Sequence, residues 1–150
     1  MPLSGEYAPS PAAWVREQVE EYEASGGERA NTLGDTGLPV VIVTMRGRTS
    51  GKIRKAPVMR VEHDGRYALV ASKGGAPEHP LWYRNLIAGP ETVTLQDGSE
   101  PFDVEVRELD GAEREEWWQR AVEAYPPYAD YQASTERRIP VLLATRRGAA

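Results

Sequence analysis

Residues 39–61 read PVVIVTMRGRTSGKIRKAPVMRV, an apolar run, a basic turn and a second apolar run. Residues 39–45 are apolar on both alternating faces, which is typical of a strand buried inside a sheet. Residues 56–61 return from the turn, and we expect them to pair with the first run. The stretch therefore predicts a β-hairpin with a charged tip.

The tip belongs to a longer basic window, which we call the basic island. It contains six basic residues and no acid between Asp35 and Glu62: Arg46, Arg48, Lys52, Arg54, Lys55 and Arg60. The whole chain has a formal net charge of -5, so the remainder carries -11. Such a patch favours one specific anion over a nucleic acid or a membrane surface, because the negative background repels polyanions.

The composition narrows the protein class. A length of 150 residues fits one structural domain. Within it we expect an N-terminal helix and connector over residues 1–36 and a barrel over residues 37–150. Cysteine is absent, which excludes disulfides, thiolate metal sites and thiol nucleophiles. No run approaches the roughly 20 apolar residues of a membrane span, and no signal-peptide pattern is present. We therefore expect a cytoplasmic protein.

The rest of the chain predicts more strands and a few helices. Apolar spacing and turn residues predict helices over residues 11–24, 81–88 and 110–124. Alternation and Asp-Gly turns predict strands over residues 66–72, 91–96 and 101–109, and a last strand over residues 139–145. With the hairpin this makes six strands, the first three forming a meander. We predict a mainly β fold with peripheral helices, a small six-stranded antiparallel barrel.

Two segments could form an anion site together. In the basic tip, Gly47 and Gly51 allow the backbone to approach a ligand, and Thr49 and Ser50 add hydroxyl and amide donors. The run from Ser72 to Gly75 lies between a strand and a helix, where amides and an ammonium group can converge on one anion. Each segment alone is also compatible with a solvated turn or a flexible loop.

A tyrosine cluster and several missing motifs point to cofactor chemistry. Tyr125, Tyr128 and Tyr131 recur every three residues, so on a helical turn they share a face, either packing in the core or lining a pocket. His63 and His79 have no second metal ligand at a suitable spacing, and no nucleophile elbow, Walker loop or dinucleotide fingerprint is found. The reactive atom is therefore expected on a cofactor.

Four blocks occur here in the order seen in the deazaflavin (coenzyme F420)-dependent nitroreductase family, which the chain resembles over residues 39–145. They are GRTSGKIR at residues 47–54, ASKGGA at 71–76, PLWYRNL at 80–86 and YPPYADYQ at 125–132, and RIPV at 138–141 also matches. The resemblance implies a split β-barrel of the FMN-binding type. It also implies coenzyme F420, a deazaflavin with a phosphate and an oligoglutamate tail, in preference to FMN.

The resemblance also implies roles for particular residues. Tail and phosphate contacts fall on the tip and on Lys73, and the ring pocket falls on the second and third blocks. The implied cofactor-binding residues are Arg48, Thr49, Ser50, Gly51, Lys52, Arg54, Lys55, Pro57, Ser72, Lys73, Gly74, Gly75, Ala76, Trp82 and Asn85. The implied catalytic residues are Tyr125, Tyr128, Tyr131 and Ser72. Thr49 departs from the pattern, because many relatives have lysine there.

The activity implied is hydride transfer from the reduced deazaflavin to a small-molecule acceptor. Similar proteins reduce quinones, nitroaromatic compounds or unsaturated lactones, as quinone reductases or nitroreductases. The alternative is a non-catalytic carrier or sensor of a deazaflavin or flavin. We expect no metal and no nucleic-acid partner, a monomer or homodimer, and at most peripheral access to quinone at the inner face of the membrane, because the N-terminal helix is acidic.

Overall fold

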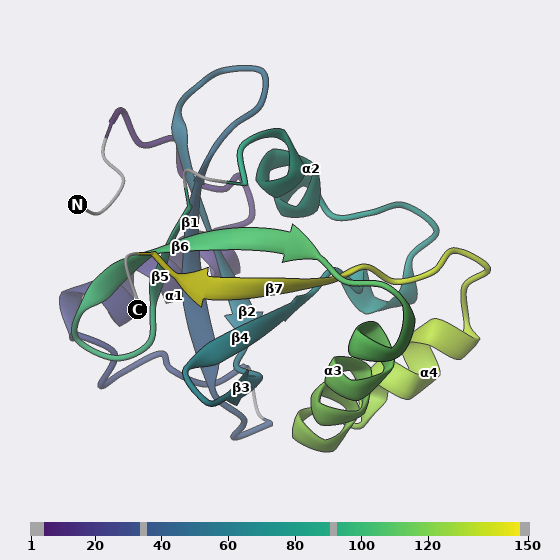
Figure 1. Ribbon diagram of the computed structural model, residues 1–150. Coiled ribbons are helices and arrows are strands. Elements are labelled where there is room, and N and C mark those ends of the chain that lie inside the picture. The colour runs from purple at the N-terminus through teal and green to yellow at the C-terminus, as the bar shows by residue number, and fades with distance from the viewer. Residues whose placement is uncertain (1–4, 34–35, 91–92, 148–150) are drawn as a thin grey trace.

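A computed structural model describes residues 5–33, 36–90 and 93–147 (Figure 1). Its strands form one curled sheet, with helices packed around it. The elements in chain order are α1 (Ala13–Ala24), β1 (Val40–Arg46), β2 (Ile53–Met59), β3 (Glu62–His63), β4 (Arg66–Val70), η1 (Lys73–Gly75), α2 (Leu81–Ala88), β5 (Val93–Gln96), β6 (Pro101–Glu108), α3 (Gly111–Ala124), α4 (Pro127–Ala133) and β7 (Val141–Arg146).

The sheet is antiparallel and turns back on itself. Its strand order is β2-β1-β5-β6-β7-β4-β3, so β2 and β3 stand at opposite ends. Only Arg60 and Val61 separate these two strands in the chain, which forces the two edges of the sheet together. The amide of Ala68 in β4 donates to the carbonyl of Val61 at 2.8 Å, which extends the pairing of β3 with β4 to the residue before β3. The expected small antiparallel split barrel is confirmed.

The strand inventory differs in two details from the expectation. Seven strands occur in the described residues instead of six, because the two-residue β3 pairs with β4 around the turn at Asp64 and Gly65. In the expected meander of the first three strands, the pairing of the second strand with the third is confirmed only around the turn between them, where residues 61–63 pair with the start of β4. β2 itself does not pair with β4, whose other partner is β7. Local patterns identify strands but not partners this distant in sequence. Residues 91–92 of the predicted fifth strand lie outside the described residues.

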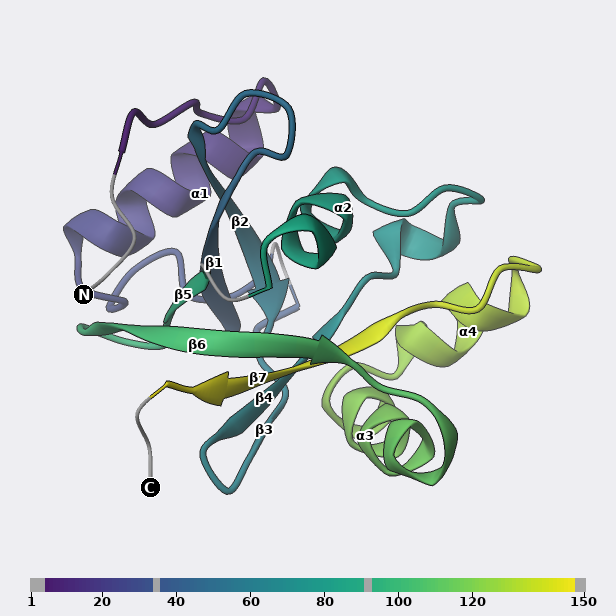
Figure 2. The same cartoon turned by 45° about the horizontal axis from the view of Figure 1, so that its top comes forward.

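Both faces of the sheet are covered, which explains the unbroken apolar run in β1. Val40 and Ile42 belong to one buried cluster, and Val41 and Val43 belong to another. The first cluster also takes side chains from α1, α3 and α4, and the second takes side chains from α2. Figure 2 shows α1 beside β1 and β2, with α3 and α4 together at the other end of the sheet. In the described part of the chain, no helix is long and apolar enough to cross a membrane.

The start of α3 is held differently from the capping box that Asp110 and Glu113 indicate. Asp110 is the N-cap residue, but its side chain makes no cap hydrogen bond. Glu113 instead accepts two hydrogen bonds from the Arg107 guanidinium, at 2.8 and 2.6 Å. A bidentate pair of this kind is stronger than a neutral cap bond. The helix is therefore tied to β6 at its first turn.

Candidate functional site

A cleft of about 600 Å³ opens between β2, η1, α2 and the segment around α4. Segments distant in sequence contribute to it, because the curled sheet brings the hairpin, the loop after β4 and the helices after β6 to one side. Its lining residues are Ser10, Trp14, Val15, Leu33, Met45, Arg54, Lys55, Ala56, Pro57, Val58, Met59, Val70, Ser72, Lys73, Pro80, Leu81, Trp82, Asn85, Tyr125, Tyr128 and Tyr131.

The first wall of the cleft comes from β2. Arg54, Lys55 and Pro57 of the predicted set line it, in the register that pairs Arg54 with Met45 of β1. Lys55 makes an ion pair with Glu23 of α1. Arg54 makes no ion pair with any acid in the described part of the chain, so its charge is available to a ligand.

The hairpin tip stands beside the cleft without lining it. The Arg48 amide donates to the Asn85 side-chain oxygen at 3.0 Å, which ties the tip to α2 (Figure 1). Gly51 adopts φ +72°, the left-handed conformation that the tight turn requires. Thr49 and Ser50 lie in the same turn, where the Ser50 hydroxyl accepts from the Lys52 amide at 3.1 Å. The predicted tip residues are therefore near the cleft mouth.

Three of the six basic-island side chains make ion pairs with acids in the described part of the chain. Besides the pair between Lys55 and Glu23, Lys52 pairs with Glu6 at 2.8 Å and Arg60 pairs with Asp97 at 2.9 Å. The sequence shows no acid inside the window, but these three carboxylates arrive from other segments. The charge offered to a ligand is consequently smaller than the count of six indicates.

The second wall is the loop after β4. Ser72 and Lys73 line the cleft, with Ser72 in the right-handed helical region and Lys73 at φ +46°. This pair of conformations makes a backbone nest, a concavity that binds anions through its amides. Among the described residues no acceptor takes the amide hydrogens of Ser72 and Lys73. The Lys73 ammonium pairs with the exposed Glu78 at 3.2 Å.

The rest of this predicted block supports the loop from behind. Gly74 lies in η1, and Gly75 and Ala76 do not line the cleft. Gly75 has φ +83°, and a Cβ there would meet the Tyr131 carbonyl at 2.9 Å and clash with Ser134. Glycine at position 75 thus allows the loop to pack directly against α4.

The third wall comes from α2. Trp82 and Asn85, three residues apart, lie on one face of this helix and both line the cleft. The helix ends where the sequence predicts, at Ala88 before Gly89. The indole of Trp82 offers a flat apolar surface, and the amide of Asn85 connects this surface to the hairpin tip.

The tyrosines form the fourth wall, and all three line the cleft. Tyr125 follows α3, while Tyr128 and Tyr131 belong to α4, so the group spans two helices instead of one turn. The Tyr125 and Tyr131 hydroxyls are hydrogen-bonded at 3.0 Å. This bond, with burial, raises the pKa of Tyr125 to about 12.

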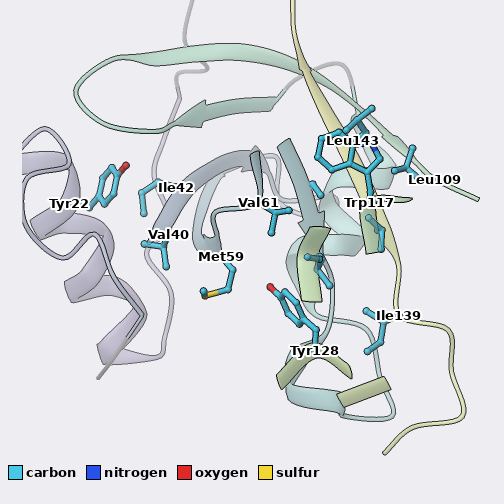
Figure 3. Packing of buried hydrophobic residues seen from close by; sticks show 14 of the residues in the cluster. Tyr22, Val40, Ile42, Met59, Val61, Leu109, Trp117, Tyr128, Ile139 and Leu143 are labelled. Atoms are coloured by element: carbon cyan, nitrogen blue, oxygen red, sulfur yellow. The ribbon is translucent and has the colours of Figure 1, made fainter. Parts of the chain in front are cut away.

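Tyr128 is the most enclosed of the three, with 3% of its surface exposed. Its hydroxyl has no hydrogen-bond partner within the described residues, and Figure 3 shows it on the side of Met59, another cleft residue. Burial raises the pKa of Tyr128, so the phenol is protonated at neutral pH. It is therefore a donor that a ligand can use.

The sequence predicts that the N-terminal helix covers the barrel or the mouth of the site, but it did not identify which residues of this segment line the cleft. Trp14 and Val15 at the start of α1 line the cleft, and Trp14 is 60% exposed at its edge. Leu33, in the connector, lines it as well. The apolar stripe of the helix predicts burial against the barrel, which Val19 and Tyr22 confirm. No local signal separates a residue that packs in the core from one that borders a cleft.

The arrangement suits a planar, anionic ligand. Cations and unpaired amides line the same cleft as aromatic rings and phenols. No cluster of potential metal ligands occurs among residues 5–33, 36–90 and 93–147. The polar groups in the cleft can bind, orient and donate hydrogen bonds. A separate group must supply redox chemistry.

Comparisons with known proteins agree with this geometry. The family model described as F420H(2)-dependent quinone reductase matches residues 14–146. Two Mycobacterium tuberculosis proteins bearing that family name are similar to this chain. The first is 37% identical over 106 residues, covering 71% of this chain and 88% of the relative. The second is 32% identical over 112 residues, covering 73% and 74%.

Solved structures give the same result. A structure titled F420-H2 dependent reductase is 56% identical, with a TM-score of 0.67, and covers 71% of this chain and 93% of that chain. Another, titled as a domain-swapped dimer, is 51% identical, with a TM-score of 0.69, and covers 90% and 99%.

Proposed function

Because the chain belongs to the F420H(2)-dependent quinone reductase family, we propose that it reduces a small electrophilic acceptor with a hydride from reduced coenzyme F420. The single observation that carries the proposal is that cationic donors and phenols line the same cleft. A cofactor with an anionic tail and a flat ring needs the cationic donors. An acceptor that gains negative charge needs the phenols, which can donate hydrogen bonds to it.

The donors present fit this cofactor. Arg54 and Lys73, with the unpaired amides of Ser72 and Lys73, would hold anionic oxygens. Trp82 would contact the ring system, and Asn85 would join that contact to the tip that carries Arg48. When bound, reduced coenzyme F420 supplies a hydride. The chain orients the two reactants and shields them from water.

The acceptor side is proposed to use the tyrosines. Tyr128 is buried and keeps a free hydroxyl, and Tyr125 and Tyr131 share one hydrogen bond between them. Tyr125 and Tyr128 are neutral donors at pH 7, as the ordinary tyrosine pKa of about 10 already requires, and their surroundings raise the pKa further. Their hydrogen bonds would stabilise the charge that develops on an acceptor oxygen. This chemistry fits a quinone best and also allows a nitroaromatic or unsaturated acceptor.

The test is a titration of the purified protein with oxidised coenzyme F420, FMN and FAD, followed by turnover with a quinone and a nitroaromatic compound. We expect selective binding of the deazaflavin and reduction of the quinone. Equal affinity for FMN would overturn the cofactor assignment. Tight deazaflavin binding without turnover of any acceptor would instead indicate a carrier or sensor.

Assembly and location belong to the same proposal. We expect a monomer or a homodimer in the cytoplasm, and the similar structure titled as a domain-swapped dimer supports testing for the dimer. Light scattering after size exclusion at several protein concentrations measures the mass directly. A species larger than a dimer would contradict the expectation.

A further inference from the structure

Arg137 holds the loop that contains Ser72 and Lys73 from behind. Its Nη2 donates to the Ser72 carbonyl at 2.7 Å, its Nη1 to the Ala71 carbonyl at 3.2 Å, and its Nε to the Ala76 carbonyl at 2.7 Å. Its Nη1 is also 2.9 Å from Nδ1 of His79. One guanidinium thus bonds three backbone oxygens at both ends of the loop.

These bonds fix the direction of the two unpaired amides. In a trans peptide the carbonyl and the N–H point in opposite directions, and the described residues contain no cis peptide. The carbonyl of Ala71 shares its peptide unit with the amide of Ser72, and the carbonyl of Ser72 shares its unit with the amide of Lys73. Since Arg137 binds both carbonyls, both amides point away from it. Arg137 does not line the cleft, whereas Ser72 and Lys73 do.

Among the described residues, no carboxylate contacts the Arg137 guanidinium to neutralise its charge. In the described part of the chain it makes no ion pair, and its bonding partners are backbone oxygens and an imidazole nitrogen. The carboxylate of Glu78, which acts on it through space, bonds to Lys73 instead. A cation behind two peptide units polarises them so that their amides become better donors.

Arg137 is itself held by the tyrosine helix. Its carbonyl accepts from the Gln132 side chain at 2.8 Å, and Gln132 also accepts from the Ile139 amide at 2.9 Å. The packing of Gly75 against Tyr131 adds a second junction between η1 and α4. The loop on the cofactor side and the helix that carries Tyr128 and Tyr131 are therefore joined through this arginine.

We propose that Arg137 is a positioning residue, which aims the amides of Ser72 and Lys73 at an anionic oxygen of the bound cofactor and fixes that loop to α4. The inference rests on the proposed function, because it assumes that the cleft binds the deazaflavin. Arg137 touches neither cofactor nor acceptor in this arrangement. Its loss should consequently weaken cofactor binding while leaving the acceptor's own binding unchanged.

The experiment compares Arg137→Ala, Arg137→Lys and Arg138→Ala with the unmodified protein. Arg138 is the matched control, because it is the adjacent arginine, is exposed and lies outside the cleft. Fluorescence titration with oxidised coenzyme F420 gives the cofactor Kd, and steady-state kinetics give KM for a quinone. A second titration uses a tail-less deazaflavin without the phosphate. Thermal melts and circular dichroism report folding.

We expect Arg137→Ala to raise the cofactor Kd by about tenfold or more, since two charge-polarised hydrogen bonds lose their geometry. Arg137→Lys should recover part of this loss, because lysine keeps the charge but lacks the planar fork of donors. The quinone KM and the Arg138→Ala protein should change by about twofold at most. If Arg137→Ala does not fold, Arg137→Lys carries the test.

The titration with the tail-less deazaflavin shows which part of the cofactor carries the oxygen that the two amides bind. An Arg137 effect confined to coenzyme F420 places the amides at the phosphate or the glutamate tail, and an equal effect on both ligands places them at the ring system. A lower melting temperature with unchanged cofactor Kd in both Arg137 variants would overturn the inference and leave only a structural role. If the unmodified protein binds no deazaflavin, the proposed function fails first, so the two failures are distinguishable.

Discussion

At the scale of single residues, ion pairing separates the cations that hold the fold from those offered to a ligand. Among the residues that the structure describes, Arg54 lines the cleft without an acidic partner, and Lys73 pairs only with the exposed Glu78. We predict that Arg54→Ala or Lys73→Ala weakens coenzyme F420 binding by roughly ten- to a hundred-fold, because each leaves ligand charge unpaired. Fluorescence titration measures the change.

Arg29→Ala is the control for that pair of variants. Arg29 is an exposed cation paired with Glu21, and it does not line the cleft. Its removal changes the net charge by the same amount but should leave the cofactor Kd within about twofold. Equal losses in all three variants would mean that only the overall charge matters.

Tyr128 gives a prediction about turnover. Tyr128→Phe removes a hydroxyl without a partner in the described residues, so the fold and the cofactor Kd should persist, while kcat/KM falls unequally for a quinone and a nitroaromatic compound. Stopped-flow oxidation of the reduced cofactor by each acceptor gives the two kcat/KM values. Loss of cofactor binding in this variant would show that Tyr128 contacts the cofactor and not the acceptor.

Tyr67→Phe provides the matched comparison. The Tyr67 hydroxyl donates to Asp97 at 2.6 Å, and this tyrosine lies outside the cleft. Its loss should lower the free energy of unfolding by about 1 to 3 kcal/mol, because the bond is made to a charged group, and should leave kcat/KM unchanged.

At the scale of elements, α1 packs its apolar face against the barrel. Val19 and Tyr22 are buried, and Arg16 is outnumbered by four glutamates along the helix. We predict no salt-sensitive sedimentation with anionic vesicles, since the helix surface repels them. A variant with Glu17, Glu20 and Glu21 changed to lysine is the control, and it should gain binding. Strong sedimentation of the unmodified protein would contradict this prediction.

The loop before α2 gives a pH prediction through His79. Burial and the charges of Arg137 and Arg84 lower the pKa of His79, and the Glu108 carboxylate acts in the opposite direction. The centroid of the Tyr83 ring lies 4.8 Å from that of the imidazole. Below about pH 6.5 the unfolded chain binds a proton that the folded chain does not, so stability must fall as the pH falls.

Urea unfolding at a series of pH values between 5 and 7.5 measures this dependence. The free energy of unfolding should decrease toward pH 5, and His79→Gln should flatten the curve across this window. The pKa values of the Asp103 and Glu113 carboxyl groups are lowered, so their contributions to stability are lost below this pH window and do not affect the comparison. A curve of the same slope in both proteins would rule out the His79 contribution.

At the scale of the whole molecule, a cationic cleft sits in a protein of net charge -5. Attraction to a polyanionic tail is therefore local and screened by salt. We predict that the coenzyme F420 Kd rises steeply between low and high salt, and that the FMN Kd rises less because FMN carries one phosphate. Arg54→Ala should flatten the coenzyme F420 curve. Parallel curves for the two cofactors would show that the glutamate tail is not bound by the cations.

The sequence by itself determined most of the helices and strands and about half of the residues that line the cleft. The period-two pattern and the Asp-Gly turns identified the major strands, and Gly89 marked the end of α2. Of the predicted site, Arg54, Trp82 and the three tyrosines do line one cleft. These features are local, because they depend on the conformational preferences of neighbouring residues and on apolar periodicity.

Only the tertiary structure decided which strands pair, which cations stay available and what aims the loop amides. The partnership of β4 with β7 and the ion pair of Lys52 with Glu6 join residues far apart in sequence. Arg137 reaches a loop some sixty residues earlier in the chain, and no spacing in the sequence marks that contact. Contacts of this kind depend on how the curled sheet closes, which is a property of the packed chain and not of any segment.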